Sequence, residues 1–424
     1  MKISLDVDVR HLARIEGHGN IRVVIRDGKL QEARWDVVET PRYFEAILKG
    51  KHYTSAGILT ARICGICSIG HCLASLRATE QAFGVAVPES AVRLRLLAKH
   101  GETLQSHWLH LFFLTAPDFL GLPSLLPLLE ASPEVVHLAR RLRGVGNRLC
   151  DVVAGRTTHP VSLQPGGVSV FPPREKLLGL RDELERSLMD ITAAAELFST
   201  FTVPLFQRET EFVALKGETG YPWIGGRLIS TDGVEHAESD YLMMTNEYVH
   251  PDSTSKWCRL TRGSFAVGAL ARFNNNHLRL HHEAASLASS LGLTPVCHNP
   301  FMNSTAQLVE CLQVTHESIL LIDDLLREKP GATMVPVVPQ AGVGVGAVEV
   351  PRGILYHNYE YDAEGYIVRA DCIIPTTQNN ANIHHDIQSL AGSSAVAGMT
   401  DERLELLCSM LVRAYDPCVS CSVH

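Results

Sequence analysis

The sequence contains no uninterrupted apolar run of membrane-spanning length. Its most apolar stretch, residues 107–129, approaches that length but contains three prolines and one aspartate. These interruptions favour a buried helix followed by a turn. The N-terminal residues also lack the apolar core of a secretory signal peptide. We therefore expect neither a direct membrane span nor an export signal in this chain.

An excess of basic residues is missing as well. Lys and Arg number 38 against 46 Asp and Glu, which gives a net charge of −8. Nucleic-acid binding usually requires a basic surface, so we expect no nucleic-acid partner. No low-complexity tract, Pro/Ser-rich linker or internal repeat is evident in the 424 residues. The chain is therefore predicted to form one large body rather than a string of separate domains.

The cysteines do not indicate a disulfide framework. Their number, 11, is odd, and seven of them stand alone in apolar or helical surroundings. These seven are predicted to be small buried hydrophobic side chains: Cys72, Cys150, Cys258, Cys297, Cys311, Cys372 and Cys408. The other four form two CxxC pairs near opposite ends of the chain, Cys64 with Cys67 and Cys418 with Cys421.

Hydrophobic periodicity predicts an α-rich α+β fold. Residues 3–9, 20–26 and 30–38 alternate polar and apolar side chains, which is typical of strands in a small N-terminal β-sheet. Long core helices are expected from about residue 86, where apolar residues recur at helical spacing, and again at 277–291 and 301–328. A last helix is expected at about 400–414.

The expected body has five successive regions. Short mixed β segments are predicted where Gly, Thr, Asp and aromatic residues replace the helical pattern. The regions are 1–85, an N-terminal sheet region with the first CxxC pair; 86–203, a helical core; 204–275, an irregular mixed-β segment; 276–330, a second part of the helical core; and 331–424, a C-terminal α+β region with the second CxxC pair.

Each CxxC pair can bind a metal ion through two thiolates. Two such pairs give a four-sulfur site, and on spacing alone a structural zinc site is favoured. The halves of a zinc ribbon usually come from nearby hairpins, whereas Cys67 and Cys418 are separated by almost the entire chain. This separation indicates a buried cofactor site. Zinc, iron and nickel all accept thiolate ligands, so the ligand type leaves the metal open.

Three separated motifs resemble the signatures of [NiFe]-hydrogenase large subunits. They are RIEGHG at 14–19, RICGICSIGH at 62–71 and DPCVSCSVH at 416–424. Further segments that resemble the family are RYFE at 42–45, residues 107–119, GRTTHP at 155–160, EVPRG at 349–353 and IIPTTQNN at 373–380. The resemblance implies a catalytic subunit that carries out reversible heterolytic H2 oxidation and proton reduction. The chain is most similar to the cytosolic multi-subunit type, which implies a cytoplasmic location.

The resemblance also implies a nickel-iron centre on the four paired cysteines. Cys64 and Cys418 would be terminal ligands of nickel. Cys67 and Cys421 would bridge nickel to an iron that carries carbon monoxide and two cyanide ligands. Cys418 would also accept a proton, which Glu16 would then pass outward. Without the resemblance, Glu16 reads as an exposed carboxylate at the end of a strand.

A buried arginine is implied beside this centre. In the family, Arg352 would lie over the open coordination site with Pro351 before it, held by Asp118 and Asp416. Thr376 would add a second hydrogen-bond donor for the diatomic ligands of iron. Without the family context, the arginine would read as part of an ordinary buried ion pair.

A magnesium site and a supporting histidine complete the implied set. Glu45, the backbone carbonyl of Cys372 and His424 would bind magnesium and tie the C-terminal segment into the fold. His71 would hydrogen-bond near a bridging sulfur, although a core or capping histidine is the alternative. In the family, a protease usually removes an extension after the residue that corresponds to His424, so the end of this sequence resembles the mature form.

Electrons would have to leave through another protein. No third cysteine cluster has iron-sulfur spacing, and the resemblance implies an iron-sulfur small subunit in an obligate heterodimer. Three alternatives compete with a fast-turnover hydrogenase. They are an H2-sensing subunit of low turnover, the related subunit of respiratory quinone reductases, which lacks the four cysteines, and a structural zinc protein.

Overall fold

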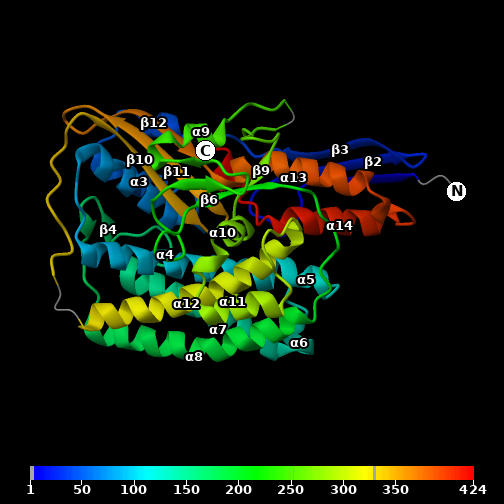
Figure 1. The fold of residues 1–424 in the computed structure, drawn as a ribbon, viewed down its shortest axis with the longest axis horizontal. Coiled ribbons are helices and arrows are strands. Elements are labelled where there is room, and N and C mark those ends of the chain that lie inside the picture. Colours follow the sequence, from blue (N-terminus) through cyan, green and yellow to red (C-terminus); the bar gives the residue numbers. More distant parts are fainter. Residues whose placement is uncertain (1–3, 252, 328–330) are drawn as a thin grey trace.

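The computed structural model describes residues 4–251, 253–327 and 331–424. Long helices form one layer of the molecule and small β-sheets lie in the other, together with helices α13 (Pro375–Gly392) and α14 (Asp401–Ala414) (Figure 1). This arrangement confirms the predicted α-rich α+β class. Residue 3 of the first expected strand and residue 328 of an expected helix lie outside the described residues.

The N-terminal sheet matches the predicted alternation. It consists of β1 (Leu5–Val9), β2 (Gly19–Arg26) and β3 (Lys29–Val37), which are antiparallel in the order β1-β2-β3. Helix α13 (Pro375–Gly392) packs against β3, where the indole N–H of fully buried Trp35 donates a hydrogen bond to Asn380. The alternation of polar and apolar residues therefore corresponds to a sheet that packs one of its faces against the core.

A second antiparallel sheet lies against helix α3 (Ser68–Phe83). It contains β10 (Gly342–Val350), β11 (Gly353–Tyr361) and β12 (Ile367–Ile373). A Cβ atom at Gly344 would lie 2.0 Å from the carbonyl oxygen of Ala78, and one at Gly346 would lie 2.1 Å from that of Ala74. The Val/Gly alternation of this strand thus allows the backbone of α3 to approach the sheet closely.

The helical layer contains the long helices that were predicted. Helix α4 packs on α7, and α12 packs on both α4 and α8, and Figure 1 shows them running along the lower half of the molecule. Their hydrophobic stripes face one another, which buries the core between them. The bounds are α4 (Glu89–Leu109), α7 (Pro133–Ala154), α8 (Arg174–Ser199), α11 (His282–Ser290), α12 (Asn303–Arg327) and α14 (Asp401–Ala414).

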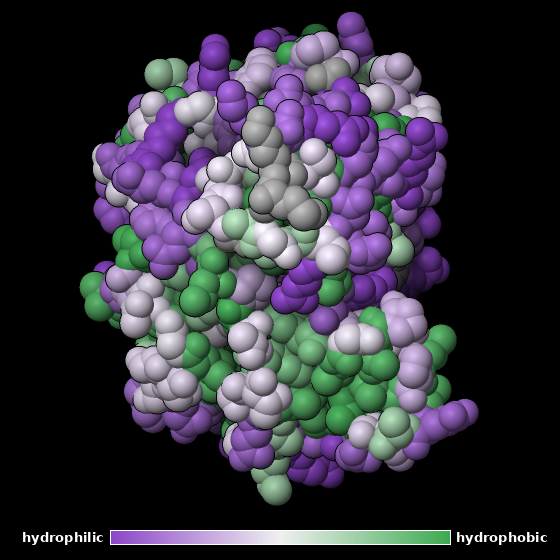
Figure 2. All heavy atoms as spheres, turned by 90° about the vertical axis from the view of Figure 1, so that its right-hand side faces the viewer, coloured by the Kyte–Doolittle hydropathy of each residue, from purple (hydrophilic) through white to green (hydrophobic). Residues whose placement is uncertain are grey.

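The apolar stretch at 107–129 is a buried helix end followed by a turn, as predicted. Helix α4 continues through a π-helical segment, His110–Thr115, into the short α5 (Ala116–Phe119). No described helix combines the length and apolarity that a membrane crossing requires. The next short helix, α6 (Leu128–Ala131), follows on the same side of the molecule, and Leu126 and Leu129 are exposed. Figure 2 shows this side of the molecule, with apolar side chains gathered on its lower half.

The middle of the chain forms short strands and turns, as expected. Its main sheet has the order β8-β7-β6-β9, with only β6 and β9 parallel. Several helices were not anticipated, because their residues are buried on most sides or their length is one or two turns. The remaining elements are α1 (Phe44–Leu48), α2 (Tyr53–Thr60), β4 (Leu163–Gln164), β5 (Gly167–Val168), β6 (Glu211–Leu215), β7 (Leu228–Ser230), β8 (Glu235–His236), α9 (Leu242–Thr245), β9 (Phe265–Ala266), α10 (Ala269–Asn276) and α15 (Val419–Ser422).

Candidate metal centre

The two CxxC pairs meet in the interior although they lie at opposite ends of the chain. The Sγ atoms of Cys64 and Cys418 are 3.5 Å apart, and those of Cys418 and Cys421 are 2.7 Å apart. The Sγ of Cys67 lies within 4.8 Å of that of Cys421. All four residues are buried, and none of the eleven cysteines forms a disulfide. The structure therefore contains a four-sulfur cluster.

The N-terminal pair is held by its own turn and by the start of α3. Cys64 Sγ accepts hydrogen bonds from the backbone N–H groups of Ile66 and Cys67, each at 3.3 Å. Cys67 directly precedes α3, and Glu102 on α4 accepts the N–H of Ile69 at 2.8 Å. A carboxylate at a helix N-terminus satisfies N–H groups that have no partner within the helix. The position of this pair is thus fixed by the α3–α4 packing.

The C-terminal pair is held by residues distant in sequence. The N–H of Cys418 donates to Thr376 Oγ1 at 3.0 Å, and the N–H of Val419 donates to the backbone oxygen of Glu16 at 2.9 Å. Arg42 donates to the carbonyl oxygen of Ile63 at 2.7 Å and also to that of Ser420. Arg42 therefore joins both halves of the cluster. The RYFE motif that contains it gave no indication of this role.

The carboxylate of Glu16 lies directly beside the cluster. Its Oε2 is 3.1 Å from Cys418 Sγ and accepts the N–H of Ser420 at 3.1 Å, while Oε1 accepts the Ser420 hydroxyl. The side chain is only half-buried. A carboxylate that touches a sulfur at one end and reaches toward solvent at the other has the geometry of a proton carrier.

Arg352 lies on another side of the cluster, in the turn between β10 and β11. It is buried, with Nη2 2.8 Å from Asp416 Oδ1 and Nη1 3.4 Å from Ser106 Oγ. Burial lowers the pKa of Arg352, but Asp416 and the cluster sulfurs more than offset this, so the pKa is raised well above its usual value. Its Nε has no hydrogen-bond partner among the described residues. The guanidinium is therefore charged and has an N–H group available.

Asp118 does not hold Arg352, in contrast to the expectation. Within the ranges that the structure describes, Asp118 pairs with Arg413 at 2.8 Å and with Arg14, and no ion pair joins it to Arg352. Two guanidinium groups compete successfully for this buried carboxylate because together they satisfy both of its oxygens. Arg352 is thus held by one aspartate, Asp416, instead of two.

A second buried arginine supports the turn that carries Arg352. Arg272 on α10 is fully buried and donates to the carbonyl oxygens of Val350 at 2.9 Å and Pro351 at 3.1 Å. Glu310 on α12 holds it through two hydrogen bonds of 2.7 Å each. This bidentate pair fixes the backbone immediately before Arg352. No motif in the sequence had pointed to Arg272.

His71 lies on the first turn of α3, with a ring nitrogen within 4.8 Å of the sulfurs of Cys67 and Cys421. Nδ1 is 3.1 Å from His357 Nε2, and Nε2 is buried without a partner among the described residues. Burial lowers the pKa of His71 to about 4. A neutral imidazole with a free nitrogen beside two sulfurs fits the supporting role that was predicted for it.

The three residues predicted to hold magnesium also lie together. His424 Nε2 is 3.6 Å from Glu45 Oε1 and hydrogen-bonds to the backbone oxygen of Cys372. Burial raises the pKa of Glu45, but the neighbouring His424 and the N–H donated by Cys372 lower it by more, so that the pKa is about 2. Glu45 is thus ionised at neutral pH, and two oxygens and one nitrogen are available for a hard cation.

The donor atoms of the cluster fit a group of soft metals. The hydrogen bonds of the Cys418, Cys421 and Cys67 thiols to Cys64 lower the pKa of Cys64 well below its usual value. Thiolates favour ions such as zinc, nickel and iron over magnesium or calcium. The buried four-sulfur cluster therefore fits a metal group, and its thiols would lose their protons when the group binds.

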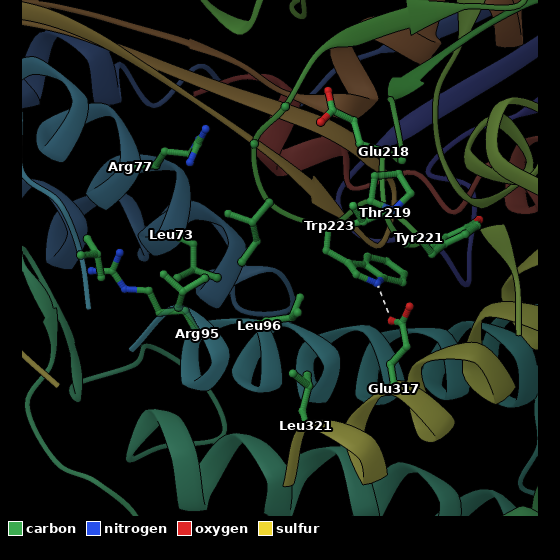
Figure 3. Close-up of a pocket in the computed structure, with 18 of the residues that line it drawn as sticks. Leu73, Arg77, Arg95, Leu96, Glu218, Thr219, Tyr221, Trp223, Glu317 and Leu321 are labelled. Atoms are coloured by element: carbon green, nitrogen blue, oxygen red, sulfur yellow. Dashed lines mark hydrogen bonds between the residues drawn. The ribbon is translucent and has the colours of Figure 1, made fainter. Parts of the chain in front are cut away.

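A separate cavity of about 770 Å³ lies between α3, α4, α12 and residues 216–226 (Figure 3). No cysteine lines it. Trp223 Nε1 donates to Glu317 Oε2 at 2.9 Å within it, and Tyr221 donates to Glu310 at 2.8 Å. Tyr221 in the cavity wall is therefore hydrogen-bonded to Glu310, the carboxylate that holds Arg272, whereas none of the four cluster cysteines lines the cavity.

Comparison with known proteins gives a consistent result. The family model described as nickel-dependent hydrogenase matches residues 42–140 and 253–424. The chain is 31% identical to the alpha subunit of sulfhydrogenase 1 of Pyrococcus furiosus, over 100% of this chain and 98% of that protein. It is 30% identical to the beta subunit of the NAD-reducing hydrogenase HoxS of Cupriavidus necator, over 97% and 93% of the two chains.

A solved structure shows the same fold. The NAD+-reducing [NiFe]-hydrogenase in its H2-reduced state superposes with a TM-score of 0.88 at 29% identity, and the match covers 99% of each chain. Similarity of sequence and of fold therefore extends over the whole chain, including both CxxC pairs. The chain belongs to the nickel-dependent hydrogenase family, as the catalytic subunit of a [NiFe] hydrogenase.

Proposed function

We propose that this subunit carries out reversible H2 oxidation at a nickel-iron group held by its four paired cysteines. Cys64 and Cys418 would hold the nickel, and Cys67 and Cys421 would hold the nickel together with an iron that carries carbon monoxide and two cyanide ligands. The observation that carries the proposal is the four-sulfur cluster, buried and built from both ends of the chain. When bound, the group supplies Lewis-acid and redox chemistry that splits H2 into two protons and two electrons.

Cys418 and Glu16 move the proton in this proposal. Cys418 Sγ lies 3.1 Å from Glu16 Oε2, within reach of direct proton transfer. The hydroxyl and N–H of Ser420 both bind the same carboxylate and keep it turned toward the sulfur. Glu16 is half-buried, so it can release the proton toward solvent.

Arg352 and Thr376 would donate hydrogen bonds to the diatomic ligands of the metal group. The unpartnered Nε–H of Arg352 is a buried donor, and such a group is strong because the surroundings have a low dielectric constant. Thr376 accepts the N–H of Cys418, which leaves its hydroxyl hydrogen free to donate. Both residues are held before any ligand arrives, and this preorganisation lowers the cost of binding it.

The same proposal includes magnesium at Glu45, the carbonyl of Cys372 and His424. The support is the proximity of these three donors and the ionised state of Glu45. Oxygen ligands suit magnesium, and the ion would join the C-terminal residue to α1 and β12. It would thereby fix the segment that carries Cys418 and Cys421.

Electrons leave through an iron-sulfur small subunit in an obligate heterodimer. Relatives that are named as alpha subunits, such as that of sulfhydrogenase 1, support a partner of this kind. The described cysteines outside the cluster are single and do not form an iron-sulfur site of their own. A cytoplasmic location, as in the multi-subunit type that the sequence resembles, is part of the proposal, and cell fractionation tests it.

Metal analysis and infrared spectroscopy of the purified heterodimer test the central proposal. One nickel should be present per heterodimer, with iron in excess of nickel because the iron-sulfur small subunit contributes iron of its own, with bands in the carbon monoxide and cyanide stretching regions and with magnesium as a third metal. Zinc without nickel, and no such bands, would overturn it. Turnover with an artificial electron acceptor should be steady, and very slow turnover with intact bands would instead indicate the H2-sensing alternative.

A further inference from the structure

A second group of metal-ligating side chains lies where α11 meets α12, on elements that contribute no cysteine to the cluster. One ligand atom from each of His281, Glu283 and His316 lies within 4.8 Å of the other two. We propose that these three side chains bind one divalent transition-metal ion of the zinc class. The site is independent of the function proposed above, since it shares no residue with it.

The geometry requires only a small adjustment to accept an ion. His316 Nε2 is 2.9 Å from Glu283 Oε2, and the rings of His281 and His316 stack with centroids 4.1 Å apart and an interplanar angle of 22°. Zinc lies about 2.0–2.1 Å from nitrogen and oxygen ligands, so ligand atoms around it are separated by roughly 3.3 Å. The three side chains already approach this spacing from two different helices.

His281 has the protonation state that a metal ion needs. Burial lowers the pKa of His281, and the neighbouring His316 and His282 lower it further. Two stacked imidazoles cannot both be protonated without strong repulsion. His281 is therefore neutral at neutral pH and offers a lone pair, while Glu283 supplies the negative charge.

The site is reachable from solvent and has a further donor at hand. The side chain of Glu283 is 53% exposed and that of His316 is 15% exposed. His282 is 79% exposed, and its ring centroid lies 4.2 Å from that of His281. Water or His282 can therefore fill the fourth position of a tetrahedral ion.

A simple His–Glu ion pair explains less of what is observed. It accounts for the contact between His316 and Glu283 but not for the stacking of His281 on the same ring. His281 also caps the N-terminus of α11, where its Nδ1 accepts the N–H of Glu283 at 3.4 Å, a long hydrogen bond that a metal ion can replace. Two imidazoles and one carboxylate favour zinc or nickel over magnesium or calcium.

Zinc titration of the intact heterodimer tests this site. The holoenzyme is dialysed against a chelator, and bound zinc is then measured at equilibrium for the parent protein and for His316→Gln and Glu283→Gln. The parent should bind one more zinc ion than His316→Gln. In both variants the affinity for zinc should fall by at least about 10–100-fold. Removing a group that only hydrogen-bonds to a metal ligand already has an effect of this size, and these substitutions remove a ligand itself.

A matched control is His137→Gln, which removes an exposed histidine from α7. It should bind zinc as the parent does. Glu283→Gln changes a half-exposed side chain and therefore keeps the test valid even if His316→Gln folds poorly. Equal zinc binding by the parent and Glu283→Gln would overturn the proposal, as would a parent protein that binds no additional zinc.

Discussion

The two CxxC pairs form one cluster but are held in place by different means. The first pair depends on contacts from its own turn and from the adjacent packing of α3 on α4. The second pair depends on Thr376, Glu16 and Arg42, which lie 42 residues or more from their partners in the sequence. The first half of the cluster is thus a local structure, and the second half is a tertiary one.

This difference suggests an order of assembly for the metal centre. The N-terminal half can form when α3 packs on α4, because Glu102 satisfies N–H groups at the start of α3. The C-terminal half requires the last nine residues to contact the first strand region and the start of α13. Arg42 can make both of its side-chain hydrogen bonds only when both halves are present, since its Nη2 donates to Ile63 and to Ser420.

Removing one cysteine from each half gives the largest expected effect. Cys64→Ser and Cys418→Ser should both lose nickel, because serine is a hard and weakly acidic ligand. H2 turnover should fall by at least about 1,000-fold, beyond the loss that follows removal of a single preorganised donor. Nickel content by metal analysis and turnover with an artificial acceptor measure this.

Buried cysteines near each half provide matched controls. Cys72→Ser on α3 and Cys408→Ser on α14 change the same side chain in similarly buried positions. They should lower stability but retain nickel. If Cys64→Ser kept its nickel while Cys418→Ser lost it, the N-terminal and C-terminal halves would not both be needed to bind nickel.

Glu16→Gln tests the half of the cluster that is open to solvent. Glutamine can still bind Ser420 but cannot carry a proton, so hydrogen–deuterium exchange catalysed by the enzyme should slow by about 100–10,000-fold. Nickel, iron and the infrared bands should be unchanged. The control is Glu39→Gln, which alters a carboxylate bonded to His18 in the same region. Exchange at the parent rate would refute the role of Glu16.

Arg352→Lys tests the buried side of the cluster, where the effect should be smaller. Lysine keeps the positive charge but cannot contact Asp416 and Ser106 while leaving a further N–H free. Turnover should fall by about 100-fold, with metals retained and cyanide bands shifted. Arg413→Lys, which alters the partner of Asp118, should leave the bands in place. Unshifted bands in Arg352→Lys would contradict a contact with the cyanide ligands.

The fold was predictable where a local pattern carries the information. Strands β1, β2 and β3 and helices α7 and α8 have one buried and one exposed face, so their periodicity is visible in the sequence. Helices α3 and α13 are buried on nearly all sides. They therefore lack the polar face that would have revealed a helical period.

The site was predictable only in part, for a similar reason. The paired cysteines and Glu16 lie in short motifs, whereas the partners of Arg352 depend on distant segments. Sequence could not tell which arginine Asp118 would bind, and in the structure Arg413 contacts both of its oxygens. The support that Arg272 gives to Pro351 spans 79 residues and involves a backbone oxygen, which leaves no mark on side-chain patterns.

Thr376→Val gives the smallest expected effect and separates local from global stability. It leaves the buried N–H of Cys418 without an acceptor, at a cost of about 1–3 kcal/mol. Because only the C-terminal half depends on this bond, amide exchange should rise at residues 416–424 and stay unchanged at the start of α3. Thr315→Val is the control, since its hydroxyl donates only to the helix carbonyl of Cys311. Faster exchange spread equally over both halves would mean that the two CxxC pairs unfold as one unit, and the contrast between a local and a tertiary half would then fail.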